Sequence, residues 1–127
     1  MSSFSDFLES ALLNHVFRNT AYTQPATIYM GLYTAAPTDA GGGTQVSGGG
    51  YARQAVTFGA PSGGQIANTG AVAFTASGAN FGTVVAVGFF DALTAGNLLA
   101  WDAITSAVVN DGDTLNFASS QITISLD

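Results

Sequence analysis

Few residues in this sequence have the chemistry for catalysis, and histidine is the clearest case. His15 is the only histidine, and the 127 residues include no cysteine. A histidine acts as a general base when a nucleophile lies beside it. His15 lies among apolar residues of an expected helix, and no Gly-x-Ser-x-Gly motif precedes a helix. The sequence therefore predicts no catalytic residue, and we expect a protein that is not an enzyme.

Acidic and glycine-rich segments also fail as metal or nucleotide sites. The segment Asn110–Asp113 resembles the start of a calcium loop, but such a loop closes with a glutamate, and Glu9 is the only glutamate in the chain. It is a stronger signal for a hairpin turn. The glycine triplets Gly41–Gly43 and Gly48–Gly50 lack the Gly-Lys-Ser/Thr that follows in a phosphate-binding loop. We predict no metal and no cofactor.

Asp91 and Asp102 are candidates for the pair of carboxyl groups that a glycosidase uses. Asp91 and Asp102 flank one expected strand, and two carboxyl groups must lie about 5 to 10 Å apart for glycoside hydrolysis. Both adjoin predicted turns, where aspartate is common because it bonds its own backbone. A local structural role is the favoured interpretation.

The shortage of charge is the most unusual property of the chain. Charged residues make up 8% of it, compared with about 25% in an ordinary soluble domain. Two arginines and a net charge of -6 argue against direct contact with nucleic acid. No run approaches the roughly 18 to 20 apolar residues of a membrane-spanning helix, so no membrane partner is expected. Acidic residues near the start also argue against a secretory leader.

A surface made mostly of uncharged polar and small residues is inexpensive to desolvate. Interface cores are depleted in charge for the same reason. We therefore expect a structural protein that packs against copies of itself or against a partner. A merely acidic, glycine-rich domain is the alternative interpretation.

The elements expected around these residues begin with one amphipathic helix over residues 3–18. Ser3 is the expected cap, and Asp6 three residues later suits the positive end of the helix dipole. An apolar stripe follows helical spacing, and it would either cover the protein's own core, which we favour, or dock on a partner. The stripe comprises Phe4, Phe7, Leu8, Ala11, Leu12 and Val16.

After the helix the apolar period changes to that of strands. About seven to eight short strands separated by turn signals predict a mainly β, sandwich or jelly-roll-like fold over residues 26–127. A Gly-rich loop spans 35–50. The strand from Thr83 to Phe90 has no polar face, so it should be covered on both sides. We expect one domain over residues 1–127.

Aromatic and apolar side chains are the best candidates for contact with other molecules. The tyrosines would suit either an assembly interface or a carbohydrate-binding face, and we favour the interface. The candidate interface residues are Phe4, Phe7, Leu8, Leu12, Tyr29, Tyr33, Tyr51 and Phe90.

Four segments of the chain resemble a family of small virion proteins of tailed bacteriophages. They are 28–39 (IYMGLYTAAPTD), 46–54 (VSGGGYARQ), 87–92 (VGFFDA) and 96–101 (GNLLAW). The resemblance covers nearly the whole chain. Members of that family are described as head decoration (cement) proteins, tail-fibre proteins or structural proteins.

The resemblance implies a role in the virion, with the major capsid protein or other virion proteins as partners. We expect a capsid decoration protein that bridges capsid subunits through many weak contacts. The alternative is a tail-fibre module or a receptor- or glycan-binding module of the tail. By analogy with other phage decoration proteins, we expect a homo-oligomer and specifically a trimer.

Overall fold

The computed structural model describes residues 3–126, so residues 1, 2 and 127 of the expected domain lie outside the described part. One helix and a series of short strands follow in chain order, and the fold is mainly β as predicted. The elements are β1 (Ser3–Phe4), α1 (Asp6–Phe17), β2 (Ile28–Ala35), β3 (Thr44–Gln45), β4 (Gln54–Val56), β5 (Gln65–Ala67), β6 (Val72–Thr75), β7 (Gly82–Phe90), β8 (Leu98–Val109), β9 (Thr114–Phe117) and β10 (Thr123–Ser125).

The largest sheet is antiparallel and is built around β2 and β7. Its strand order is β1-β8-β7-β2-β3, and β4 also pairs with β2. Both central strands are covered on their two faces, since consecutive residues from Met30 to Tyr33 and from Ala86 to Phe90 are buried. The strand expected over residues 83–90 is confirmed, and it is covered on both faces from Ala86 to Phe90, whereas Thr83 is exposed.

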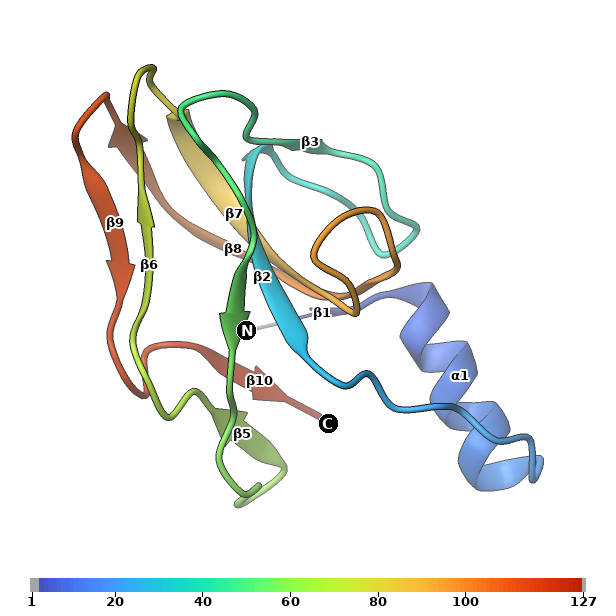
Figure 1. Ribbon diagram of the computed structural model, residues 1–127. Coiled ribbons are helices and arrows are strands. Elements are labelled where there is room, and N and C mark those ends of the chain that lie inside the picture. Colours follow the sequence, from blue (N-terminus) through green and yellow to red (C-terminus); the bar gives the residue numbers. More distant parts are fainter. Residues whose placement is uncertain (1–2, 127) are drawn as a thin grey trace.

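Two narrow ribbons form a second layer over one face of this sheet. β6 pairs with β9, and β5 pairs with β10. Figure 1 shows both ribbons on the same side of the sheet, with β6 and β9 at one end and β5 and β10 at the other. The main core lies between the layers, where Phe74 and Phe89 are almost fully buried together with Met30 and Leu32. This arrangement agrees with the predicted β-sandwich.

The turn at Asn110–Asp113 forms as predicted, but it does not join a hairpin. The amide of Asp113 donates to the carbonyl of Asn110, and Gly112 has a φ of 90°. However, β8 before the turn pairs with β7, whereas β9 after it pairs with β6. The turn carries the chain from one layer to the other, so the predicted hairpin is corrected to a corner between sheets.

A buried asparagine joins the ends of the second layer. Asn68 is 1% exposed, and its Nδ2 donates to the carbonyls of Gly70 (2.7 Å) and Ala118 (3.0 Å). Its Oδ1 accepts from the amide of Ile122 at 2.9 Å. Buried polar side chains must be bonded to be tolerated. Asn68 therefore connects the segment between β5 and β6 to the segment between β9 and β10.

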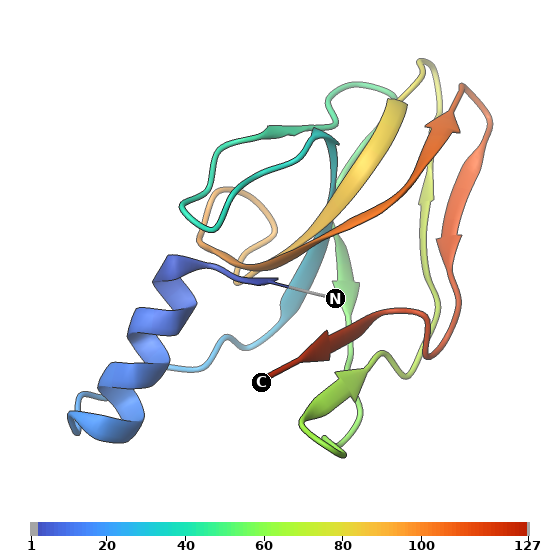
Figure 2. The ribbon, with the colours of Figure 1, turned by 180° about the vertical axis from the view of Figure 1, so that it is seen from behind.

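The helix begins later than the sequence suggested, and it packs differently. Ser5 is the N-cap, and its hydroxyl accepts from the amide of Leu8, whereas Ser3 belongs to β1. None of the residues of α1 is buried, and Phe4, which lies in β1, is the member of the predicted stripe that packs against the main core. The expectation that the helix itself covers the core is therefore wrong. Figures 1 and 2 both show α1 projecting from the β layers, with the chain returning alongside it toward β2.

The predicted Gly-rich loop has a defined path, with β3 inside it. Val46 from this loop is buried, and its amide donates to the carbonyl of Leu32. Gly49 has a φ of 61°, and a Cβ there would lie 2.7 Å from the carbonyl oxygen of Ala79. The glycine at this position therefore allows both a left-handed backbone and a close approach to the segment before β7.

Candidate interaction surface

The eight predicted interface residues do not share one surface. Tyr33 and Phe90 are 3% and 4% exposed, so they pack inside the chain and offer no contact area to a partner in this conformation. Phe4 and Tyr51 are partly buried and pack against the main core. Leu8, Leu12 and Tyr29 are half-buried. Only Phe7, at 41%, is a largely exposed member of the set.

Tyr33 and Phe90 form a second small core on the other face of the sheet. Their rings are stacked, with centroids 6.4 Å apart. Arg53 covers this core, since its guanidinium carbon lies 3.5 Å from the centroid of Phe90. The same group donates to the carbonyls of Ala92 (2.9 Å) and Ala95 (2.7 Å). Burial lowers the pKa of Arg53, and these contacts tie the loop after β7 to the sheet.

Two facing glycines make room for these rings. Gly31 of β2 lies opposite Gly88 of β7 in the sheet register. A Cβ on Gly88 would lie 2.8 Å from Tyr33 Cε2 and 3.0 Å from Leu98 Cδ1. The absence of side chains at this pair lets large rings lie flat on the sheet. The aromatic residues that looked available for binding are thus required for the fold.

Tyr51 also has an internal function. Its hydroxyl accepts from the amide of Leu32 at 3.0 Å and lies 3.1 Å from Gln45 Oε1. Burial raises the pKa of Tyr51, and it also raises that of Tyr33.

The two aspartates considered for glycoside hydrolysis, Asp91 and Asp102, lie in different local structures. Asp91 accepts from the backbone amide of Asn97 (2.7 Å) and from its side chain (2.9 Å), which is the local role that the sequence indicated. Asp102 lies within β8, in register with Val87, and does not adjoin a turn. The strand expected to end before Asp102 in fact continues to Val109.

The helix carries the clearest exposed apolar stripe among the described residues. Leu13, Val16 and Phe17 are 58%, 65% and 79% exposed. Their spacing of three and four residues places them on one side of α1. The opposite side of the helix contacts the returning chain, since Phe7 packs edge-on against Tyr22 and His15 Nδ1 accepts from the amide of Tyr22 at 3.1 Å.

An open depression of about 300 Å³ lies between α1 and this returning segment. Its lining combines the Phe7 and Tyr22 rings with Ser10, Asn14 and Thr20. Aromatic faces beside hydroxyl and amide groups match the composition of a surface that contacts sugars. Of the aromatic residues considered for a carbohydrate-binding face, which are Tyr22, Tyr29, Tyr33, Tyr51 and Trp101, Tyr22 lines this depression.

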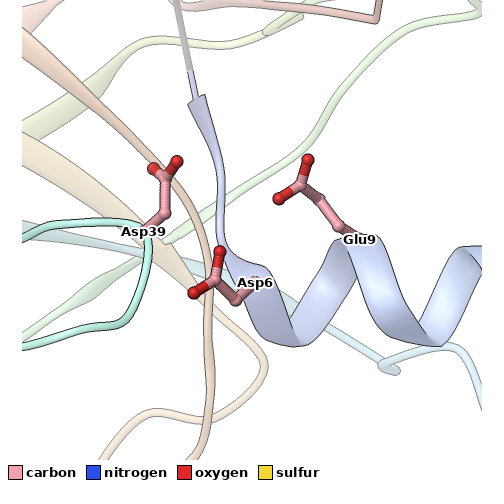
Figure 3. A group of neighbouring side chains, drawn as sticks. All are labelled: Asp6, Glu9 and Asp39. Carbon is pink, nitrogen blue, oxygen red and sulfur yellow. The ribbon is translucent and has the colours of Figure 1, made fainter.

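Three carboxylates gather at the start of α1. Asp6, Glu9 and Asp39 have ligand oxygens that all lie within 4.8 Å of one another, and Figure 3 shows the three side chains where the loop meets the helix. Asp39 accepts from Trp101 Nε1 at 2.9 Å, and its carbonyl accepts from the amide of Asp6. The positive end of the helix dipole favours negative charge at this position. The group was not anticipated, because Asp39 is distant in sequence.

Within the part of the chain that the structure describes, no helix has the length and hydropathy needed to cross a bilayer.

Comparison with known families gives a match over nearly the whole chain. The model of the family described as Podophage GP4 fiber I protein gp80 matches residues 3–125. The chain belongs to this family. A search of curated proteins gives no significant match.

Membership in the gp80 family confirms the resemblance to virion structural proteins of tailed phages. The chain is a phage structural protein, and the virion is its location. The matched range includes α1, both layers and the loops that join them. The exposed stripe of α1 is therefore part of the family domain and not an appendage to it.

Proposed function

We propose that this chain is a subunit of a fibre on the phage tail. The observation that carries the proposal is the match to a fibre-protein family over residues 3–125. The family description favours the tail-fibre alternative over the expected capsid decoration role. The partners that we propose are other virion proteins and further copies of the chain.

The fold suits a module that works by contact. The central strands β2 and β7 are buried on both faces, so the body presents a fixed shape to its neighbours. Its surface has few charged residues, so most of it is inexpensive to desolvate. In a fibre, many weak contacts between such surfaces would add through the high local concentration of subunits. We infer that the protein functions through these contacts and not through catalysis.

Electron cryomicroscopy of the intact virion tests the placement. Density that fits the two-layered β body on the tail would support the proposal, and the same density over the capsid lattice would replace it with the decoration role. Particles assembled without this chain provide the control, because the assigned density should disappear from them while the rest of the particle is unchanged. Turnover of a virion or host polysaccharide by the purified protein would contradict the inference that it is not an enzyme.

A further inference from the structure

The depression of about 300 Å³ beside α1 has two walls. Phe7, Ser10 and Asn14 belong to the helix wall, and their spacing of three and four residues places them on one side of α1. Thr20 and Tyr22 belong to the wall formed by the returning chain. Small-molecule sites occupy about 300 to 1,000 Å³, so this one lies at the lower end of the range. The space suits a single small ring and is too small for a polypeptide segment.

Contacts within the chain hold the two walls together. The amide of Thr20 donates to the carbonyl of Asn14 at 3.0 Å, and the amide of Tyr22 donates to His15 Nδ1 at 3.1 Å. The Phe7 and Tyr22 rings meet edge to face, with their centroids 6.3 Å apart. The depression therefore exists before a ligand arrives, which lowers the ordering cost of binding.

The lining combines ring surface with neutral polar groups. The rings of Phe7 and Tyr22 offer apolar surface, whereas Ser10, Asn14 and Thr20 offer hydroxyl and amide groups that both donate and accept hydrogen bonds. An entirely apolar occupant, such as a leucine of a neighbouring subunit, would cover these groups without pairing them, at a cost in free energy. The preferred occupant therefore has an apolar face and a rim of hydroxyl groups.

The charges around the depression favour an uncharged occupant. Every residue that lines it is uncharged. Arg18 brings a positive charge to the edge, since its Nη1 donates to Asn14 Oδ1 at 2.8 Å. Burial raises the pKa of Tyr22 and the carboxylate of Asp91 raises it further, so a negative charge lies near the other wall. The whole chain carries a net charge of -6, which repels acidic ligands.

We propose that this depression binds a pyranose ring of an uncharged glycan. The carbon–hydrogen face of the sugar lies against the Tyr22 ring, and the sugar hydroxyls bond the side chains of Ser10, Asn14 and Thr20. Aromatic rings with polar neighbours provide both parts of such a contact. The assignment goes beyond the proposed fibre role, because it concerns a ligand of the chain and not the place of the chain in the virion.

Binding of a single sugar should be weak. The ring has few atoms and the depression is open to solvent, so we expect a dissociation constant of about 1 to 10 mM for a monosaccharide. Many copies of the chain on one particle would raise the effective affinity for a polysaccharide.

NMR titration of the full chain tests the site. The probes are the methyl glycosides of glucose, galactose, mannose and N-acetylglucosamine, each added to about 50 mM to cover the expected range. At least one of them should cause saturable shifts confined to the depression, including the amides of Ser10 and Tyr22. The absence of saturable shifts there with all of these sugars would overturn the proposal.

An acidic sugar tests the argument from charge. Glucuronic acid should bind at least about five-fold more weakly than glucose, because the net charge of the chain repels its carboxylate. Glucuronic acid that binds as tightly as glucose would contradict the uncharged preference.

Substitutions test the contacts. Tyr22→Ala should raise the dissociation constant at least about ten-fold by removing the ring. Ser10→Ala leaves both rings in place and should raise it about three-fold. Phe17→Ala is the matched control, because Phe17 is 79% exposed on the same helix but does not line the depression, and it should change binding less than about two-fold.

Equal losses for Tyr22→Ala and Phe17→Ala would show unspecific contact with exposed rings and would refute the site. Circular dichroism of each variant verifies that α1 and the strands are folded, and Ser10→Ala decides the matter if Tyr22→Ala loses helix. The titration uses the isolated chain, whereas the fibre role is tested on the virion, so either proposal can fail without the other.

Discussion

The two-layered β body, which comprises β2 to β10, and the helix α1 differ in how their apolar side chains are covered. In the β body, the strands β2 and β7 are covered on both faces by residues of the same chain. In α1 no residue is buried, although leucine, valine and phenylalanine are as frequent there as in a core strand. The apolar residues of β2 and β7 are thus covered by the chain itself, whereas Leu13, Val16 and Phe17 of α1 are left exposed. Substitutions in the two regions should therefore have very different effects on the isolated protein.

The largest effect is expected where a buried polar side chain serves the β body. Asn68→Leu keeps the approximate volume but removes bonds to Gly70, Ala118 and Ile122, which leaves backbone groups without partners. We expect the free energy of unfolding to fall by about 3 to 4 kcal/mol, measured by urea denaturation. Asn116→Leu is the control, because Asn116 is exposed on β9. Equal stability of the two variants would show that the Asn68 bonds do not hold the layers together.

An intermediate effect is expected at the facing glycines. Gly88→Ala places a methyl group 2.8 Å from the Tyr33 ring, and the resulting displacement should cost about 1 to 3 kcal/mol of unfolding free energy. The control is Gly70→Ala, since nothing lies within 4 Å of a Cβ at Gly70. Thermal unfolding of both variants measures the difference. If Gly88→Ala had the same melting temperature as the natural protein, the Tyr33 and Phe90 rings would not be packed tightly against Gly88.

The smallest effect is expected on the helix. Val16→Ser should change the unfolding free energy of dilute protein by less than about 0.5 kcal/mol, because Val16 is 65% exposed. The same substitution at Val84, which is fully buried in β7, should cost about 2 to 3 kcal/mol. Chemical denaturation at low protein concentration compares the pair. Similar losses at the two positions would remove the distinction between the two regions.

The sequence was sufficient to predict the strand-rich body, because its apolar periodicity is local information. The dense apolar run at 83–90 correctly indicated a strand, which is covered on both faces from Ala86 to Phe90, and the glycine triplets correctly indicated a loop. The helix was located to within a few residues. Its role was mispredicted, because periodicity shows which side is apolar and not what lies against that side.

Features that depend on contacts between residues far apart in the sequence could not be predicted from the sequence. Asn68 has the appearance of an ordinary turn residue, and only the positions of Ala118 and Ile122 reveal its role. Asp39 joins Asp6 and Glu9 because the loop after β2 meets the start of α1. Tyr33 and Phe90 were candidates for an interface with another molecule, and they are inside because Arg53 and its loop close over them.

The pairing of β5 with β10 has a consequence for the order in which the protein is made. The side chains of Gln65 and Ser125 bond each other across 60 residues, and Asn68 bonds the amide of Ile122 across 54. During synthesis, strands β2 to β7 emerge before the partners that cover part of their apolar face exist. Such long-range closure is slow and leaves hydrophobic surface open to aggregation. A ribosome that stalls before residue 122 therefore releases a chain that cannot complete its second layer.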